Sequence, residues 1–203
     1  APSINSLVVS IDDVVNLEDD VAAVAFSGTT TGVEDGQTVT LDIAGQSVLV
    51  AVSSNAFSGT ADLSSLADGT TLPVQVDVMD VAGNAAPTFN STISKDTSAP
   101  SINSLVVSID DVVNLEDDAA AVAFSGTTTG VEDGQTVTVN IAGQSVLVAV
   151  SDNAFSGTVD LTAQADGAAL AVQADVSDAS GNAAPTFSGC LLYTSPSPRD
   201  TEV

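Results

Sequence analysis

The side chains of this chain that could do chemistry are almost all carboxylates. The 203 residues include 27 Asp and Glu, two Lys and Arg, no His and a single Cys, Cys190. Without His, the usual pairs of nucleophile and base are missing, and so are the usual zinc sites. Carboxylates, Asn side chains and backbone carbonyl groups are instead the oxygen ligands that Ca²⁺ prefers. The composition therefore favours cation binding over covalent catalysis.

The net charge of −25 decides which partners are excluded. A surface this acidic repels the phosphates of nucleic acids and the anionic headgroups of membranes. No apolar run approaches the roughly 20 residues of a membrane span, so we expect neither nucleic-acid binding nor membrane insertion. Two interpretations of the acids stay open. In the first interpretation, some of the acids bind Ca²⁺ at particular positions. In the second, all of them only keep a halophilic protein solvated, and concentrated NaCl would then substitute fully for Ca²⁺.

The elements that must position these acids come in two copies. Residues 99–187 repeat residues 1–89 at an offset of 98, with 74 of 89 positions identical. A repeat of this length has the size of an ordinary domain. We therefore expect a first repeat at residues 1–96, a linker at residues 97–100 and a second repeat at residues 101–187. Neither repeat contains Cys, so no disulfide stabilises it, and bound metal is the usual substitute.

Each repeat has the pattern of a small all-β domain. Residues 38–43 alternate apolar and polar side chains, and residues 48–52 continue the apolar face after a short turn. This alternation with a period of two is typical of a strand with one buried face. About seven such segments, spaced roughly ten residues apart with polar turns between them, predict a β-sandwich. The fold prediction is therefore two tandem β-sandwich domains.

The two copies diverge abruptly after Phe187. The first copy continues with NSTISKDTSAP, whereas the second continues with SGCLLYTSPSPRDTEV. The string CLLYTSPSPRD resembles a translated sequencing adapter. We therefore expect residues 188–203 to be a non-native or disordered tail and the second repeat to lack its last strand. On this interpretation Cys190 has neither a catalytic nor a structural role.

Several motifs of the chain carry a family resemblance. The segments VVNLEDD, FSGTTTGVEDGQTVT, LADGTTL and D-x-x-G-N, followed by the connector DTSAP, occur in this order. Together they resemble the bacterial immunoglobulin-like repeats of giant type I-secreted (RTX-type) adhesins, and the resemblance covers residues 1–187. It implies an immunoglobulin-like Greek-key sandwich on the bacterial cell surface, in long arrays that hold an adhesive tip away from the cell. Members of this family commonly bind Ca²⁺ at the junctions between repeats.

The strand order predicts which loops share one end of a repeat. In a seven-stranded sandwich, the loops after the first, third and fifth strands lie where the chain leaves, and the other loops lie where it enters. Acids at the exit end of the first repeat would then face acids at the entry end of the second. Six to eight oxygen ligands surround Ca²⁺. From these loops and the linker we predict a Ca²⁺ site whose ligands include Glu18, Asp68, Asp96, Asp178 and Asn182.

These observations predict a structural function, that of spacer repeats stiffened by Ca²⁺ at their junction. The partners would be neighbouring repeats of the same chain, with a cell-surface or matrix target bound elsewhere in the parent protein. The alternative is an adhesion module that binds a glycan or a protein through one loop end. An enzyme is not expected. Adjacent carboxylates such as Asp12 and Asp13 could in principle do glycosidase chemistry, but no aromatic platform for a sugar accompanies them.

Overall fold

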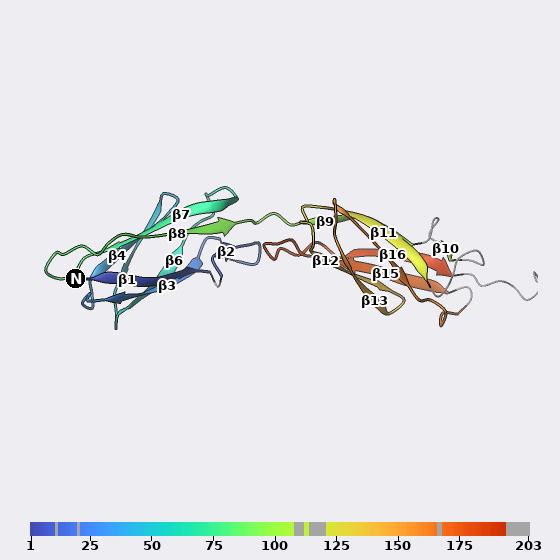
Figure 1. Ribbon diagram of the computed structural model, residues 1–203, viewed down its shortest axis with the longest axis horizontal. Coiled ribbons are helices and arrows are strands. Elements are labelled where there is room, and N and C mark those ends of the chain that lie inside the picture. The colour runs from blue at the N-terminus through green and yellow to red at the C-terminus, as the bar shows by residue number, and fades with distance from the viewer. Residues whose placement is uncertain (11, 20, 108–111, 114–120, 166–167, 194–203) are drawn as a thin grey trace, which may run out of the picture. The chain divides into compact units, whose positions relative to one another are not determined.

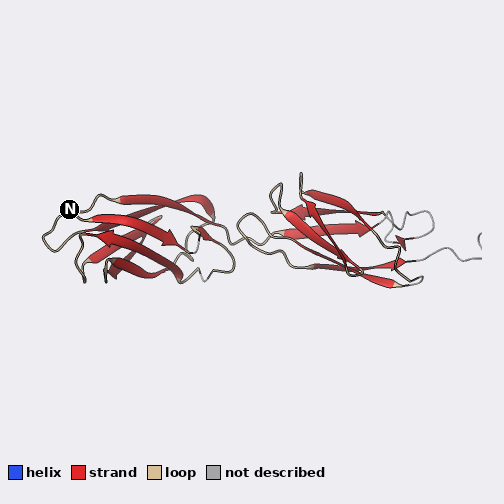
Figure 2. Cartoon of the chain, turned by 60° about the horizontal axis from the view of Figure 1, so that its bottom comes forward, coloured by secondary structure: helices blue, strands red, loops and turns tan. Residues whose placement is uncertain are grey.

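The computed structural model describes residues 1–10, 12–19, 21–107, 112–113, 121–165 and 168–193 (Figure 1). The chain divides into two compact units, Ala1–Ser98 and Ala99–Val203, and the division falls within residues 97–100. Throughout the described ranges the regular structure is β-strand, joined by loops and turns (Figure 2). The described residues accordingly contain no helix that could cross a membrane.

The first unit is a sandwich of a three-stranded and a five-stranded sheet. In the smaller sheet the order is β1 (Ser3–Val9), β3 (Val24–Thr31) and β6 (Ala56–Ala61). The larger sheet has the order β2 (Val14–Val15), β8 (Phe89–Lys95), β7 (Gly69–Val78), β4 (Thr38–Ile43) and β5 (Gln46–Ala51). Neighbouring strands are antiparallel, except that β2 runs parallel to β8. The core lies between the two sheets.

The second unit repeats this arrangement. Its smaller sheet has the order β14 (Ala154–Val159), β11 (Val122–Thr129) and β9 (Ser101–Val107). Its larger sheet has the order β10 (Val112–Val113), β16 (Phe187–Tyr193), β15 (Ala169–Asp175), β12 (Thr136–Ile141) and β13 (Gln144–Ala149). The predicted fold, two tandem immunoglobulin-like β-sandwiches, is thereby confirmed.

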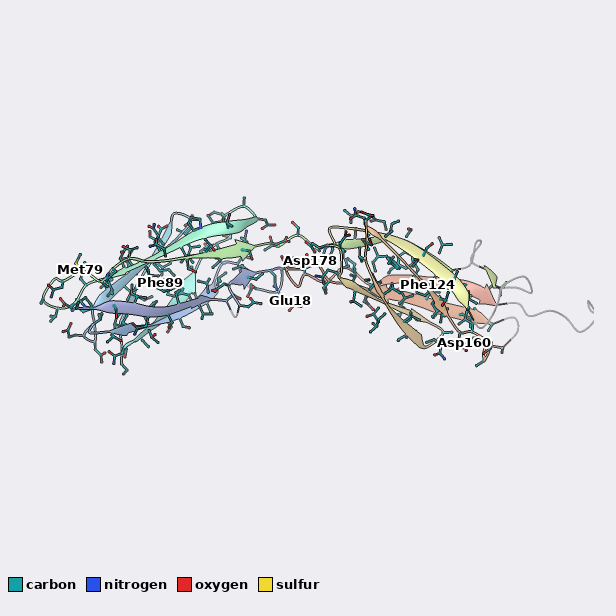
Figure 3. All side chains as sticks on the ribbon, in the orientation of Figure 1. Glu18, Met79, Phe89, Phe124, Asp160 and Asp178 are labelled. Carbon is teal, nitrogen blue, oxygen red and sulfur yellow. The ribbon has the colours of Figure 1, made fainter. Side chains whose placement is uncertain are left out.

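Alternation of buried and exposed side chains explains why these segments form strands. β3 and β11 both have the sequence VAFSGTTT, and each buries every second residue. Phe26 of β3 and Phe57 of β6 both lie in the core of the first unit, where they are 3% and 2% exposed. Phe124 is in the equivalent position between the sheets of the second unit (Figure 3). Burying one aromatic or aliphatic side chain fully contributes about 1.5–3 kcal/mol to folding, so this inward face fixes the register of each strand.

The short strand β2 lies where the sequence pattern predicts only a loop. Val14 pairs with Ser94 and Val15 with Lys95, and the Val15 side chain is fully buried. A two-residue strand has no measurable periodicity, so the alternation that reveals the other strands does not reveal this one. As a result, the acidic segment after β1 is tied to β8 at the end of the first unit.

The end of the second unit differs from the sequence-based expectation of a missing last strand. Phe187–Tyr193 form β16, which pairs antiparallel with β15 and parallel with β10. Leu191 occupies the position of Ile93 in the first unit, and both side chains are 3% exposed. A β-ladder is held by backbone groups, so a sequence that differs from the first copy can form the same strand when an apolar residue falls on the inward position. Strand pairing therefore continues into the predicted tail as far as residue 193, and Leu191 of the tail belongs to the core of the second unit.

Candidate metal centre at the loop ends

Strand direction gathers three acidic segments at one end of the first unit. We call this end, formed by residues 10, 12–19, 21–23, 62–68 and 94–98, the exit pole. Backbone hydrogen bonds link its segments, because Ser94 N donates to Asp13 O at 3.1 Å and Asp96 N donates to Val15 O at 2.9 Å. The predicted ligands Glu18, Asp68 and Asp96 all lie at this pole. The sequence-based prediction that these loops share one end is confirmed within this unit.

The segment that carries Glu18 is folded by its own acidic side chains. Asp13 Oδ1 accepts a hydrogen bond from Val9 N at 2.9 Å, and Asp13 itself has a φ of 62°. Asp19 accepts hydrogen bonds from Ser10 Oγ at 3.1 Å and from Asn16 N at 2.9 Å. Glu18 is exposed and follows β2 (Figure 3). Asp13 and Asp19 therefore shape the loop, and Glu18 is presented to solvent by it.

Asp68 is surrounded by donors from its own unit. Its Oδ2 accepts hydrogen bonds from Thr97 N and Ser98 Oγ, both at 3.1 Å, and its Oδ1 accepts one from Thr97 Oγ1 at 3.1 Å. Lys95 Nζ lies 3.5 Å from Asp68 Oδ1. Partial burial acts to raise the pKa of Asp68, but the hydrogen bonds and the Lys95 charge outweigh it and hold the pKa below its usual value. Asp68 is therefore ionised, and its carboxylate is bonded to Lys95, Thr97 and Ser98 of its own unit.

The second unit supplies the other two predicted ligands from one loop. Its entry pole consists of residues 130–135, 150–153 and 176–186, which join strands at the end where the chain enters. Asp178 Oδ1 accepts hydrogen bonds from Ser180 N at 2.9 Å and Asn182 N at 2.8 Å, while its Oδ2 accepts one from Asn182 Nδ2 at 2.8 Å. Gly181 has a φ of 87°, which explains why this turn contains Gly.

The first unit contains the same loop at its own entry pole. Asp80 accepts hydrogen bonds from Asn84 N and Asn84 Nδ2, each at 2.8 Å. The hydrogen bond from the Asn84 side chain has the larger effect and the one from its backbone the next largest, and both lower the pKa of Asp80. Gly83 has a φ of 83°. The D-x-x-G-N motif is thus a rigid turn in both copies, whether or not a metal ion binds to it.

The five predicted ligands fall into two groups, one in each unit. Asp68 and Asp96 come together at the exit pole through the connector, since Ser98 donates from its N–H to Asp96 Oδ1 and from its hydroxyl to Asp68. Asp178 and Asn182 bond to each other. Among the described residues, no three acidic or cysteine side chains lie close enough together to hold a metal ion. A site that unites the two groups stays a prediction.

Sequence reasoning missed Lys95 as a member of the exit pole. Its Nζ donates to Leu66 O at 2.6 Å and its side chain is only 6% exposed. Two signals were available in the sequence. Lys95 is the single Lys of the chain, and it stands two residues after Ile93 and therefore on the same inward face of the last strand.

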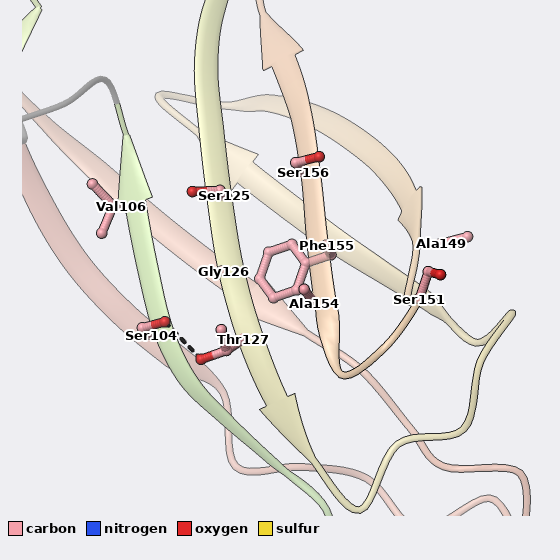
Figure 4. Close-up of a pocket in the computed structure, with 10 residues that line it drawn as sticks. All are labelled: Ser104, Val106, Ser125, Gly126, Thr127, Ala149, Ser151, Ala154, Phe155 and Ser156. Carbon is pink, nitrogen blue, oxygen red and sulfur yellow. Dashed lines mark hydrogen bonds between the residues drawn. The ribbon is translucent and has the colours of Figure 1, made fainter.

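A groove on the outer face of β9, β11 and β14 presents hydroxyl groups rather than the carboxylates of the poles (Figure 4). It has a volume of about 460 Å³ and is lined mainly by small side chains, among them Ser104, Ser125 and Thr127. Ser104 Oγ and Thr127 Oγ1 are hydrogen-bonded at 2.8 Å. The first unit has an equivalent groove of about 440 Å³. Neither lining contains an acid, so the grooves are separate from the predicted metal ligands.

Comparison with known proteins identifies relatives among solved structures. Neither a protein-family model nor a curated protein sequence matches the chain. One similar structure is of a Ca²⁺-stabilized adhesin that helps an Antarctic bacterium reach out and bind ice, with 32% identity, 97% of this chain covered and a TM-score of 0.54. Another belongs to a 1.5-MDa bacterial ice-binding adhesin studied for host cell surface retention, with 30% identity, 96% of this chain covered and a TM-score of 0.52.

For both of these structures the likeness extends over nearly the whole of this chain but only part of the relative. The chain spans 49% of the first structure and 64% of the second. A single bacterial immunoglobulin-like domain from the M. primoryensis ice-binding adhesin is 33% identical, with 47% of this chain and 96% of that domain covered and a TM-score of 0.36. The chain belongs to the family of tandem immunoglobulin-like repeats found in large bacterial adhesins.

Proposed function

We propose that the two units are extender repeats of a bacterial cell-surface adhesin and that Ca²⁺ bound between consecutive repeats fixes the angle between them. The observation that carries this proposal is the pairing of near-identical units with acidic loops at their poles. The 32% identity to a Ca²⁺-stabilized adhesin supports it. The role is structural rather than catalytic, the location is extracellular, and the direct partners are neighbouring repeats. A target on another cell or matrix would be bound elsewhere in the parent protein.

The ligands that we assign to this ion come from both units. Glu18 and Asp96 would contribute carboxylates from the first unit, and Asp178 with Asn182 would contribute oxygens from the second. This donor set consists of carboxylate and amide oxygens, which suits Ca²⁺. Asp68 was predicted as a fifth ligand, but four donor groups of its own unit already bond to it. Asp178 also accepts three hydrogen bonds from its own loop, but Asp68 is in addition paired with the Lys95 ammonium, whose charge repels a second cation. We therefore assign the metal role to the other four residues.

The chemistry of the ion is electrostatic. Ca²⁺ would neutralise carboxylates that otherwise repel one another in a chain with a net charge of −25. Because an ion that binds only the docked arrangement stabilises that arrangement, it lowers the freedom of the hinge between repeats. The residues of the chain contribute preformed loops. The Asp178 loop is held by its own hydrogen bonds, so little ordering cost remains when an ion binds.

Thermal melting of the full chain tests the proposal. A site filled at 100 times its Kd adds about 2.7 kcal/mol, and each kcal/mol moves the Tm of a domain of this size by roughly 4–8 °C. We expect the Tm in millimolar Ca²⁺ to exceed the Tm in EDTA by about 10 °C or more at matched ionic strength. Equal melts in the two buffers, or an equal rise in NaCl alone, would leave an acidic spacer without a specific ion.

Two variants make the test specific. Asp178→Ala and Asp80→Ala remove equivalent carboxylates from equivalent loops, so both lose the same hydrogen bonds. In the two-repeat chain, only Asp178 has a preceding repeat in the same molecule. We expect Asp178→Ala to abolish the Ca²⁺-dependent rise in Tm and Asp80→Ala to retain it. Loss of the rise in both variants, or in neither, would contradict a junction site.

A further inference from the structure

Lys95 is a buried cation that the proposed function does not use. It is the last residue of β8, where the alternation of the strand turns its side chain inward after Ile93. Lys95 Nζ donates to Leu66 O at 2.6 Å and forms an ion pair with Asp68 Oδ1 at 3.5 Å. A buried ammonium is costly unless it is paired and hydrogen-bonded. These contacts therefore fix both the Lys95 side chain and the loop that carries Leu66 and Asp68.

The same carboxylate holds the start of the connector. Thr97 donates its backbone N–H and its hydroxyl to Asp68, and Ser98 donates its hydroxyl. An ionised carboxylate has about four acceptor positions, and these donors together with Lys95 fill them. Hydrogen bonds to a charged group are roughly twice as strong as neutral ones. The ammonium, the carboxylate and the connector thus form one continuous network inside the first unit.

We propose that Lys95 and Asp68 form a metal-independent clamp that holds connector residues Thr97 and Ser98 against the first unit. Asp68 is the anchor of the connector in this arrangement, and Lys95 is the residue that positions Asp68. The proposal does not depend on calcium, because every contact in the clamp belongs to the protein. The second copy has Tyr193 where the first has Lys95, so the clamp is specific to the first unit.

Trypsin offers a direct test, because it cleaves after Lys and Arg. Lys95 and Arg199 are the only such residues, so cleavage between the two units reports on Lys95 alone. In EDTA we expect the full chain to be cleaved slowly at Lys95, since the bond becomes accessible only when the clamp opens. We expect Asp68→Asn to raise the cleavage rate about tenfold or more, because proteolysis follows the population of the open form.

A matched control lies in the same loop. Asp62 accepts hydrogen bonds from Ser64 N and Ser64 Oγ, and none of its hydrogen bonds involves Lys95 or the connector. Asp62→Asn therefore removes the same charge without touching the clamp, and we expect its cleavage rate at Lys95 to stay within about twofold of the unmodified chain. The double variant Thr97→Val with Ser98→Ala keeps Lys95 and its pairing with Asp68. We expect it also to be cleaved faster than the unmodified chain.

Two readouts separate an open clamp from an unfolded unit. Amide hydrogen exchange of Thr97 should accelerate in Asp68→Asn, while exchange of the β4 amides, which report on global unfolding, should change by much less. Protection of Lys95 in Ca²⁺ but not in EDTA would overturn the proposal, since calcium would then be holding the connector. Equal cleavage of Asp68→Asn and Asp62→Asn would overturn it as well. Neither result would decide the thermal test of calcium binding, which rests on Asp178.

Discussion

Glu34 accepts a hydrogen bond from the backbone N–H of Val81 at 2.9 Å, although the two residues are 47 positions apart. The second unit repeats this contact with Glu132 and Ala179, which are also 47 positions apart and bonded at 2.7 Å. In each unit the carboxylate ties the loop after β3 or β11 to the D-x-x-G-N turn. Because that turn carries Asp178 in the second unit, Glu132 supports a proposed ligand without being one.

Removing Glu132 should therefore weaken calcium binding from a distance. We expect Glu132→Ala to lower the stability of the second unit by about 1 kcal/mol through the lost hydrogen bond. The apparent affinity for Ca²⁺ should fall roughly tenfold, as is typical when a group that orients a ligand is removed. A calcium titration monitored by calorimetry measures the affinity, and calorimetric unfolding measures the stability. Glu34→Ala is the matched control, and an equal loss of affinity there would refute the assigned role of Glu132.

The ionisation of Asp68 gives the clamp a defined response to acid. Partial burial acts to raise the pKa of Asp68, but the bonds from Thr97 and Ser98 and the Lys95 charge outweigh it, so the folded pKa lies below 3.8. Folding therefore favours the ionised form. The stabilisation is fully present above the unfolded pKa of 3.8 and is lost as the pH falls through the lower, folded pKa.

The carboxyl ¹³C shift of Asp68 should accordingly titrate with a midpoint below 3.8 in the unmodified chain. In the double variant Thr97→Val with Ser98→Ala, the midpoint should move upward, because two hydroxyl donors to the carboxylate are gone. The chemical shift of the Thr97 amide should follow the same curve, since it bonds to the titrating group. A midpoint at or above 3.8 in the unmodified chain would show that the network does not hold the carboxylate.

The sequence predicted those parts of the fold that depend on side-chain alternation. β3 and β4 were predictable because each buries every second residue against the opposite sheet. β2 was not, because Val14 and Val15 are only two residues and pair with a strand about 80 positions later. β16 was missed for a different reason. The break in the repeat after Phe187 and the resemblance to a translated sequencing adapter suggested a non-native or disordered tail, whereas backbone pairing needs only an apolar side chain at the inward position, which Leu191 provides.

The candidate site was predictable as a set of loops but not as a set of contacts. Counting strands placed Glu18, Asp68 and Asp96 at one pole of the first unit, and the structure has them there. The partners of Asp68 could not be predicted in this way, because Lys95 and Thr97 are about 30 residues away and meet it only after β7 and β8 pair. Loop position alone does not separate the roles of Asp68 and Glu18, whereas contacts in the folded unit distinguish the anchor Asp68 from the exposed carboxylate of Glu18.

The last strand of the second unit allows a direct test of whether its unusual sequence is structural. Leu191 is 3% exposed and belongs to the core, while its neighbour Leu192 is 46% exposed. We expect Leu191→Ala to destabilise the second unit by about 2–4 kcal/mol, as for other buried Leu residues, and Leu192→Ala to change stability by less than about 0.5 kcal/mol. Urea unfolding followed through the methyl signals of Leu170 and Val172 reports on this unit alone. Ile93→Ala, the equivalent change in the first unit, should leave those signals unaffected. If Leu191→Ala and Leu192→Ala were both neutral, residues 188–193 would be a dispensable tail rather than the strand that completes the sheet.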